Sequence, residues 1–241
     1  MRIDVLGVGF DGLSIEQAAT HAVSIIDSRK KSYVVTPNPE IVWLCRKNAA
    51  LRDVINRATL VLPDGIGIVI GAKILKTPLQ DGRVAGIDFI SALFLKMAQS
   101  GGSVFLYGAK PGVAKTAGEK LSQKYHGLII AGTADGYGSD NDALIEQINA
   151  AHPDVLLVCL GAPKQELWIS ENIGRLNVPL SAGLGGSLDV FAGNVKRAPV
   201  FFQKFGLEWF YRILKEPQRL KRSLSLPLFL LCVIVKKITG K

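Results

Sequence analysis

A short apolar run that ends in a carboxylate constrains the fold of this 241-residue chain more than any other feature. Residues 60–62 form a continuous Leu-Val-Leu run that Pro63 ends, which predicts a strand buried on both faces. Asp64 follows directly, and a helix is predicted for residues 65–75. Because open α/β sheets bind ligands at the carboxyl ends of their strands, Asp64 is either a site residue or only the N-cap of this helix.

The same succession of apolar strand, turn and helix recurs along the first 195 residues. Further strands are predicted at residues 3–8, 33–36, 103–107, 128–133, 155–160 and 178–181. Helical patterns alternate with the strands, and this alternation is typical of a parallel sheet with helices on both faces. The sequence therefore predicts an α/β fold with a doubly covered, mostly parallel, Rossmann-like sheet.

Charge divides the chain near residue 195. The net charge of +9 arises after that point, since residues 1–195 contain 18 basic and 18 acidic side chains and residues 196–241 contain 11 basic and 2 acidic ones. A neutral body argues against nucleic acid as a partner, whereas a basic tail is attracted to anionic surfaces. We therefore predict an α/β domain at 1–195 that carries any active site, and a basic, amphipathic, membrane-associating helical appendage at 196–241.

The appendage offers too little apolar length to cross a bilayer. Aromatic and apolar residues recur at helical spacing over residues 201–213, and residues 223–235 form a run of 13 residues without charge. A helix of that length spans roughly 20 Å, whereas a bilayer core measures about 30 Å. The pattern predicts a helix at the membrane interface; the alternative is a helix packed on the body or on another copy of the chain, as a homo-oligomer. Because the start of the chain shows no signal-peptide pattern, we expect a cytoplasmic protein, peripheral on the inner face of the cell membrane.

A glycine-rich string near the start opens a different functional reading. Residues 7–12 match GxGxxG, the fingerprint of dinucleotide-binding sites. The fingerprint requires its helix to open at the glycines, whereas the predicted helix cap, Ser14, comes two residues after the last one. A glycine-rich turn is the favoured interpretation, and an NAD-dependent oxidoreductase stays as the alternative. A non-catalytic adaptor anchored to the membrane by its tail is a third reading.

Local spacing does not assemble a metal site. Asp140-Asn-Asp142 resembles the DxD string that holds a divalent metal in many sugar-nucleotide transferases, but its place before a helix favours capping. The cysteines and histidines are too far apart in sequence for a metal cluster, and the cysteines are predicted to be buried, reduced thiols; these residues are Cys45, Cys159, Cys232, His21, His126 and His152.

Polar residues follow several of the predicted strands. If the sheet is parallel, Thr36, Asp64 and Gln165 share the edge where its strands end. Arg83, ahead of a helix, is either a solvated loop residue or a partner for phosphate at this edge. The glycine-rich loop at residues 183–187 offers backbone amides for a phosphate.

Six ordered strings carry a resemblance to a known family. They are Thr36-Pro-Asn-Pro-Glu, Leu62-Pro-Asp-Gly-Ile-Gly, Arg83-Val-Ala-Gly-Ile-Asp, Gly161-Ala-Pro-Lys-Gln-Glu, Gly183-Leu-Gly-Gly-Ser-Leu-Asp and Gly206-Leu-Glu-Trp-Phe-Tyr-Arg. On these strings the chain resembles the WecG/TagA/CpsF glycosyltransferases over nearly its full length. It is most similar to the branch that contributes to teichoic acid synthesis.

The resemblance implies a reaction, its substrates and its place. Members of the family are inverting transferases that use no metal and no other cofactor. They move a sugar from a UDP donor to an undecaprenyl-diphosphate-linked sugar at the cytoplasmic membrane face. The branch that this chain resembles transfers N-acetylmannosamine to lipid-linked N-acetylglucosamine.

The resemblance also implies roles for residues at the matching positions. Asp64 is expected to be the catalytic base, with Thr36 and Gln165 beside it. The expected substrate-binding residues are Asn38, Arg83, Asp88, Gly185, Gly186, Asp189, Arg212, Arg219 and Arg222. Elementary chemistry agrees, because one carboxylate suffices to take the acceptor proton in a single displacement and arginines can neutralise the departing UDP without a metal.

Overall fold

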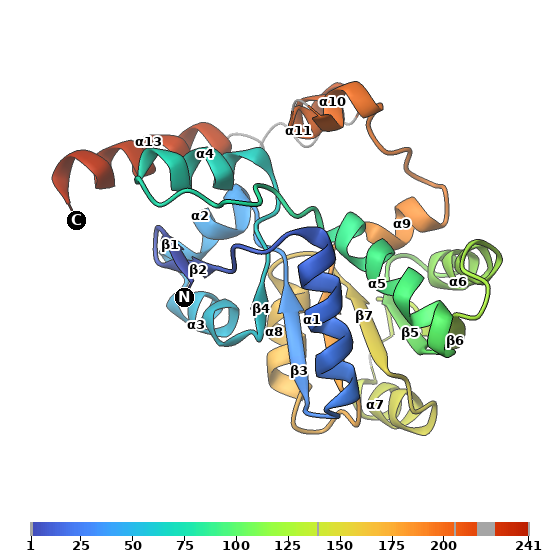
Figure 1. The fold of residues 1–241 in the computed structure, drawn as a ribbon. Coiled ribbons are helices and arrows are strands. Elements are labelled where there is room, and N and C mark those ends of the chain that lie inside the picture. The colour runs from blue at the N-terminus through green and yellow to red at the C-terminus, as the bar shows by residue number, and fades with distance from the viewer. Residues whose placement is uncertain (1, 139, 205, 216–224, 241) are drawn as a thin grey trace.

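The protein is a six-stranded parallel sheet covered by helices on both faces (Figure 1), which confirms the predicted fold class. The computed structural model describes residues 2–138, 140–204, 206–215 and 225–240. The sheet has the order β4-β3-β8-β7-β5-β6, and every neighbouring pair is parallel. Its strands are β3 (Ser32–Val35), β4 (Leu60–Val61), β5 (Ser103–Gly108), β6 (Ile129–Ala134), β7 (Val155–Cys159) and β8 (Leu180–Gly183).

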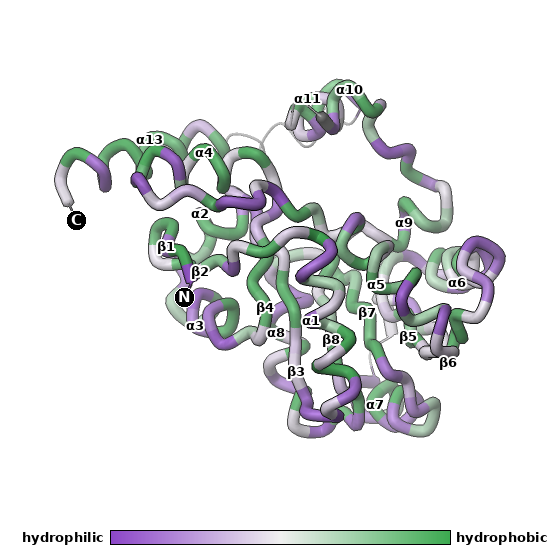
Figure 2. The backbone as a smooth tube through the Cα atoms, in the orientation of Figure 1, coloured by the Kyte–Doolittle hydropathy of each residue, from purple (hydrophilic) through white to green (hydrophobic). Residues whose placement is uncertain are grey.

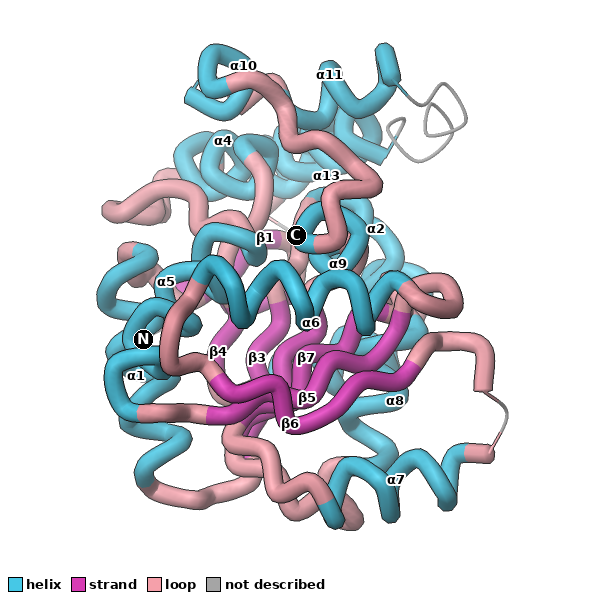
Figure 3. Tube along the Cα trace, turned by 90° about the vertical axis from the view of Figure 1, so that its right-hand side faces the viewer, coloured by secondary structure: helices cyan, strands magenta, loops and turns pink. Residues whose placement is uncertain are grey.

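Two hydrophobic clusters bury the two faces of the sheet. One face is covered by α1 (Ile15–Asp27), α5 (Gly86–Ser100), α6 (Val113–Lys124) and α9 (Ser187–Phe191). The other carries α2 (Pro39–Lys47), α3 (Ala49–Arg57), α4 (Ile66–Ile74), α7 (Asn141–Ala150) and α8 (Lys164–Asn172). The layers stand out in Figure 3, which is turned by 90° from Figure 1. Because β7 is buried at every position, its sequence reads as an uninterrupted apolar run.

The N-terminal segment differs from its prediction. Residues 3–8 do not form one strand of the main sheet; β1 (Ile3–Val5) and β2 (Val8–Phe10) form a separate antiparallel hairpin. Gly7 lies in the hairpin turn and Gly9 pairs with Asp4 across it. The glycine string therefore covers a hairpin turn and a strand, and α1 begins only at Ile15, so the tight strand-to-helix turn that a dinucleotide fingerprint requires is not present in it.

The C-terminal part contains α10 (Val200–Lys204), α11 (Glu208–Lys215) and α13 (Ser225–Thr239). α13 packs against α2 and α4 through Phe229 and Val233, both fully buried. Gly71 on α4 makes this close packing possible, because a Cβ there would lie 3.0 Å from the ring of Phe229. Within the described residues, no helix has the length and apolar character needed to cross a membrane.

Candidate active site

Two parallel strand ends bring Thr36 and Asp64 together. The ladder between β3 and β4 continues past the strands, since the Leu62 amide donates to the Val35 carbonyl at 2.9 Å and the Asp64 amide to the Pro37 carbonyl at 3.2 Å. Residues 36–38 and 62–64 therefore run side by side at one edge of the sheet. The predicted convergence of strand ends holds for this pair.

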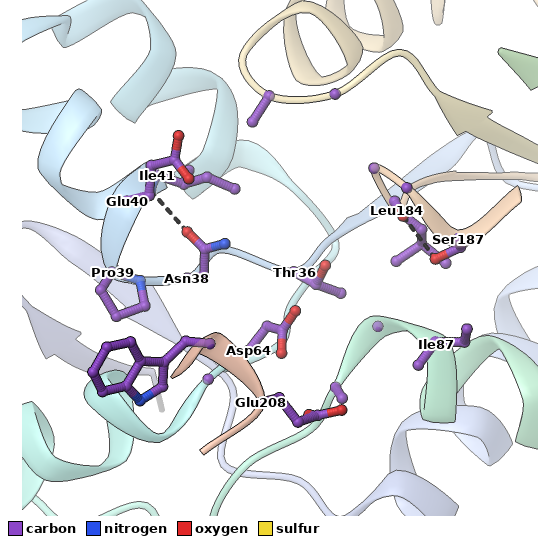
Figure 4. A pocket seen from close by; sticks show the side chains of 18 of the residues that line it. Thr36, Asn38, Pro39, Glu40, Ile41, Asp64, Ile87, Leu184, Ser187 and Glu208 are labelled. Carbon is purple, nitrogen blue, oxygen red and sulfur yellow. Dashed lines mark hydrogen bonds between the residues drawn. The ribbon is translucent and has the colours of Figure 1, made fainter. Parts of the chain in front are cut away.

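A cavity of about 520 Å³ opens at this edge. Its walls come from the loops after β3, β4, β7 and β8, from the start of α5, and from the segment around α11. The predicted site residues that line it are Thr36, Asn38, Asp64, Arg83, Gln165, Gly185, Gly186 and Asp189. Figure 4 shows Thr36, Asn38 and Asp64 beside one another at this cavity. The threonine, the aspartate and the glutamine that lie far apart in sequence thus share one cavity.

Asp64 does not occupy the N-cap position of the following helix. That position belongs to Gly65, and α4 begins at Ile66. Gly65 has φ of +88°, a conformation that favours glycine over residues with a side chain. The chain therefore turns sharply after Asp64, which leaves the carboxylate at the wall of the cavity instead of on the helix end.

Asn38 does cap its helix, as its sequence position predicts. Its side-chain oxygen accepts from the Ile41 amide at 3.0 Å, and Pro39 begins α2. Because the cap uses the oxygen, Asn38 presents its amide nitrogen to other partners while it lines the cavity. Thr36 is buried, and the backbone of Gly86 approaches it closely, because a Cβ on Gly86 would lie 3.0 Å from the threonine hydroxyl.

Gln165 ties two loops together. Its side-chain oxygen accepts from the amide of Gly161 at 3.2 Å and from the amide of Gly185 at 2.8 Å. These glycines follow β7 and β8, so one side chain holds the ends of two neighbouring strands. Since the Gly185 amide is used in this way, it is not one of the amides that the glycine-rich loop offers to a phosphate.

A network of ion pairs joins the cavity wall to the C-terminal part. Arg83 forms a short hydrogen bond with Glu208 in the first turn of α11, and both side chains are less than 20% exposed. Arg197 contacts the same carboxylate at 3.4 Å and also binds Asp88, with its Nη2 donating to Oδ2 at 2.7 Å. Asp88 therefore serves as an ion-pair partner at the start of α5, and it is not among the cavity-lining residues.

The remaining predicted arginines lie in the C-terminal part. Arg212 belongs to α11, and the orientation of its side chain is outside the described structure. Arg219 and Arg222 lie outside the described residues. Their predicted roles therefore rest on the family resemblance alone.

The capping interpretation of the DxD string is confirmed. Asp140 is the N-cap of α7 and accepts from the amides of Asp142 and Ala143, while Asp142 pairs with Arg175 at 2.7 Å. Among the residues described, no group of three His, Cys, Asp or Glu side chains is arranged to hold a metal ion.

Sequence reasoning missed Glu166, Arg197 and Glu208. Glu208 stands in a quoted family string and is one of two acidic residues after residue 195, so its isolation among cations was an available signal. Glu166 also stands in a quoted string, but nothing in the sequence indicates that its carboxyl group is buried. Arg197 carries no comparable signal, because its importance comes from contacts across the fold.

Comparison with known proteins identifies the family. The model of the WecG/TagA/CpsF glycosyl transferase family matches residues 3–241. The chain belongs to this family. A relative from Bacillus spizizenii, named N-acetylglucosaminyldiphosphoundecaprenol N-acetyl-beta-D-mannosaminyltransferase, is 41% identical over 209 residues, which cover 87% of this chain and 81% of the relative. A Staphylococcus aureus (strain MW2) protein of the same name is 34% identical over 232 residues, covering 95% of this chain and 91% of the relative. The resemblance inferred from six short strings is thereby confirmed over the length of the chain.

Proposed function

We propose that this glycosyltransferase moves N-acetylmannosamine from a UDP donor to N-acetylglucosamine carried on undecaprenyl diphosphate, in synthesis of a teichoic-acid-type polymer. The observation that carries the proposal is the cavity that joins Asp64, Thr36 and Gln165 at the carboxyl edge of the sheet. The names of the relatives support the acceptor and the sugar. In this proposal residues 1–195 form the catalytic domain and residues 196–241 complete it at the membrane.

The chemistry is a single displacement with inversion. The acceptor hydroxyl oxygen attacks the anomeric carbon, a new C–O bond forms, and the bond from that carbon to the β-phosphate oxygen of UDP breaks. Asp64 takes the acceptor proton, and UDP leaves with the bonding electron pair. Thr36, buried beside the aspartate, orients the reacting groups by a hydrogen bond from its hydroxyl.

Negative charge on the departing UDP must be neutralised within the cavity. Arg83 lines the cavity, where it is ion-paired with Glu208, and we propose that it turns to the diphosphate and that Arg212, Arg219 and Arg222 add further cations when donor binds. Guanidinium groups bind phosphate oxygens bidentately, so they can replace a divalent ion in this role. Transfer should therefore persist in excess EDTA.

The outer face of the tail suits a membrane surface. On α13 the face opposite Phe229 exposes five apolar side chains: Leu228, Leu231, Ile234, Val235 and Ile238. Lys236 and Lys237 end the same helix, and α11 exposes Trp209 and Phe210. Figure 2 shows α13 and α11 at the same end of the molecule, and each contributes a residue to the lining of the cavity, Leu226 and Trp209. An apolar face bordered by lysines fits peripheral attachment to the anionic inner face of the cell membrane.

Replacing Asp64 tests the proposal. Asp64→Asn keeps the shape of the side chain but removes the base, so sugar transfer should fall by about 10²–10⁴-fold while UDP still binds. Asp189→Asn is the matched control, because this other cavity aspartate should affect donor binding more than turnover. Near-normal turnover of Asp64→Asn would remove the aspartate from the chemistry. A wild-type protein that binds UDP but consumes no UDP-sugar would favour the adaptor reading.

A further inference from the structure

A buried carboxyl group lies directly behind the cavity. Glu166 is the third residue of α8 and is only 1% exposed. Its Oε1 accepts a hydrogen bond from Nε2 of Gln165 at 2.8 Å. Its Oε2 is buried and has no hydrogen-bond partner within the described part of the chain.

This arrangement is costly for the fold. A buried carboxyl with one unbonded oxygen loses hydration that nothing in the described structure replaces. Burial raises the pKa of Glu166, and only the Gln165 hydrogen bond and a backbone hydrogen bond oppose that shift. The charge of Glu166 contributes to the raised pKa of the Cys45 thiol on α2. That thiol is uncharged, so it does not stabilise the carboxylate. Because Glu166 costs the fold stability beside the cavity, we expect it to contribute to the function of the candidate active site.

The hydrogen bonds of Gln165 indicate what Glu166 does. The Gln165 oxygen is fully occupied by the amides of Gly161 and Gly185. One of its two N–H groups donates to Glu166. The other N–H has no acceptor among the described residues, although Gln165 lines the cavity. Two glycine amides and one carboxyl oxygen therefore fix the plane of the Gln165 amide, and its last N–H is left for a ligand.

We propose that Glu166 is a positioning residue that holds Gln165 as a hydrogen-bond donor to an oxygen of the sugar donor, either on the diphosphate or on the sugar. The inference rests on the proposed function, because it assumes that a sugar nucleotide occupies the cavity. Without the carboxyl oxygen, the two glycine amides still hold the Gln165 oxygen, but the amide plane can rotate about that end. The second N–H of Gln165 then loses its fixed direction.

Glu166→Met separates positioning from packing. Methionine has a similar length and no polar atom, so it removes the unbonded oxygen along with the acceptor for Gln165. We expect the thermal midpoint to stay level or rise, while kcat/KM for the UDP-sugar falls about tenfold. KM for the lipid acceptor should stay unchanged. Glu166→Gln keeps an acceptor oxygen for Gln165, and its kcat/KM should lie within about threefold of wild type.

Asn172 provides the matched control on the same helix. It is buried, accepts from Asn141 and donates to the Trp168 carbonyl, yet it does not line the cavity. Asn172→Leu should lower the midpoint without changing kcat/KM. If Glu166→Met behaves like this control, or if it loses stability and activity together, Glu166 has only a structural role and the proposal is wrong.

A spectroscopic readout keeps the inference independent of the reaction. In protein labelled with 15N-glutamine, the Gln165 side-chain N–H that donates to Glu166 should exchange slowly with solvent in wild type and in Glu166→Gln. In Glu166→Met that protection should disappear. Unchanged protection in Glu166→Met would overturn the positioning role even if sugar transfer is confirmed. Lost protection in a protein that transfers no sugar would instead contradict the proposed function and keep the positioning of Gln165.

Discussion

Phe229 on α13 is the side chain whose removal should separate the tail helix from the body. Phe229 and Val233 are fully buried against α4, where Gly71 leaves room for them. Burying two such side chains contributes about 1.5–3 kcal/mol each, or roughly 3–6 kcal/mol together, before the cost of ordering the helix. Truncating a buried phenylalanine to alanine costs about 3–5 kcal/mol. The loss in Phe229→Ala is therefore as large as the interaction that holds α13 in place.

The consequence should be local detachment of α13 instead of global unfolding. α13 is attached along one face only, so it can open while the sheet and its helices stay folded. Hydrogen exchange followed by mass spectrometry measures this directly. Amide protection over α13 should be lost in Phe229→Ala, while protection in α1 and α5, on the opposite face of the sheet, should stay as in wild type.

A control on the outer face of the same helix separates docking from membrane binding. Leu231 is 57% exposed, so Leu231→Ala should keep the protection of α13. It should still weaken binding to anionic vesicles, by up to about tenfold, because it removes apolar surface that would enter the membrane. If Phe229→Ala lowers protection equally in α1, α5 and α13, the helix is an integral part of the core and the reasoning is refuted.

Three further predictions concern the rest of the chain. Burial raises the pKa of Cys159 to about 12, so this thiol should react slowly with iodoacetamide in the native protein at about pH 8. The partly exposed Cys232 should be modified first, as mapped by peptide mass spectrometry. Rapid labelling of Cys159 would contradict its burial. Burial raises the pKa of Glu166 above its usual 4.5, so the folded state loses stability as pH rises past that value. Glu166→Gln should therefore raise the thermal midpoint relative to wild type, by an amount that grows from about pH 4 to about pH 7. An increase that does not depend on pH would argue against this cause. Glu208→Gln breaks two partly buried ion pairs, so hydrogen exchange in α11 should show that its opening free energy falls by about 1–2 kcal/mol. Asp4→Asn breaks an exposed pair with a lysine of α13, and the same measurement should show a loss of less than about 1 kcal/mol. Equal losses would mean that burial adds nothing to the Glu208 pairs.

The sequence predicted the features that depend on local pattern. The apolar run at residues 60–62 predicted a buried strand, and the following Asp64 was correctly placed at the sheet edge, because parallel strands end on one side. Asn38 and Asp140 were correctly read as helix caps, since capping depends on neighbouring residues alone.

Features that depend on long-range contacts were not available from the sequence. The hairpin of β1 and β2 was missed because a turn with Leu6 at φ of +56° carries none of the usual turn residues at that position. The pairing of Arg83 with Glu208 joins residues 125 positions apart, and a single sequence contains no signal for it. The same holds for Glu166, whose acidity in sequence suggests exposure and whose side chain is buried.

The glycines of α4 connect the cavity edge at Asp64 with the packing of the tail helix. A Cβ on Gly67 would lie 2.6 Å from Leu226 of the tail and 2.6 Å from Pro39. One turn further along α4, Gly71 receives Phe229 of the same tail helix. Both glycines therefore serve the packing of α13 on α4. Since α4 begins two residues after Asp64, one short helix connects the proposed base to α13, the helix whose outer face we propose as the membrane contact. Attachment of the tail and the position of the carboxylate are thus parts of one packing arrangement, which is why a change at Phe229 is expected to be felt at the cavity.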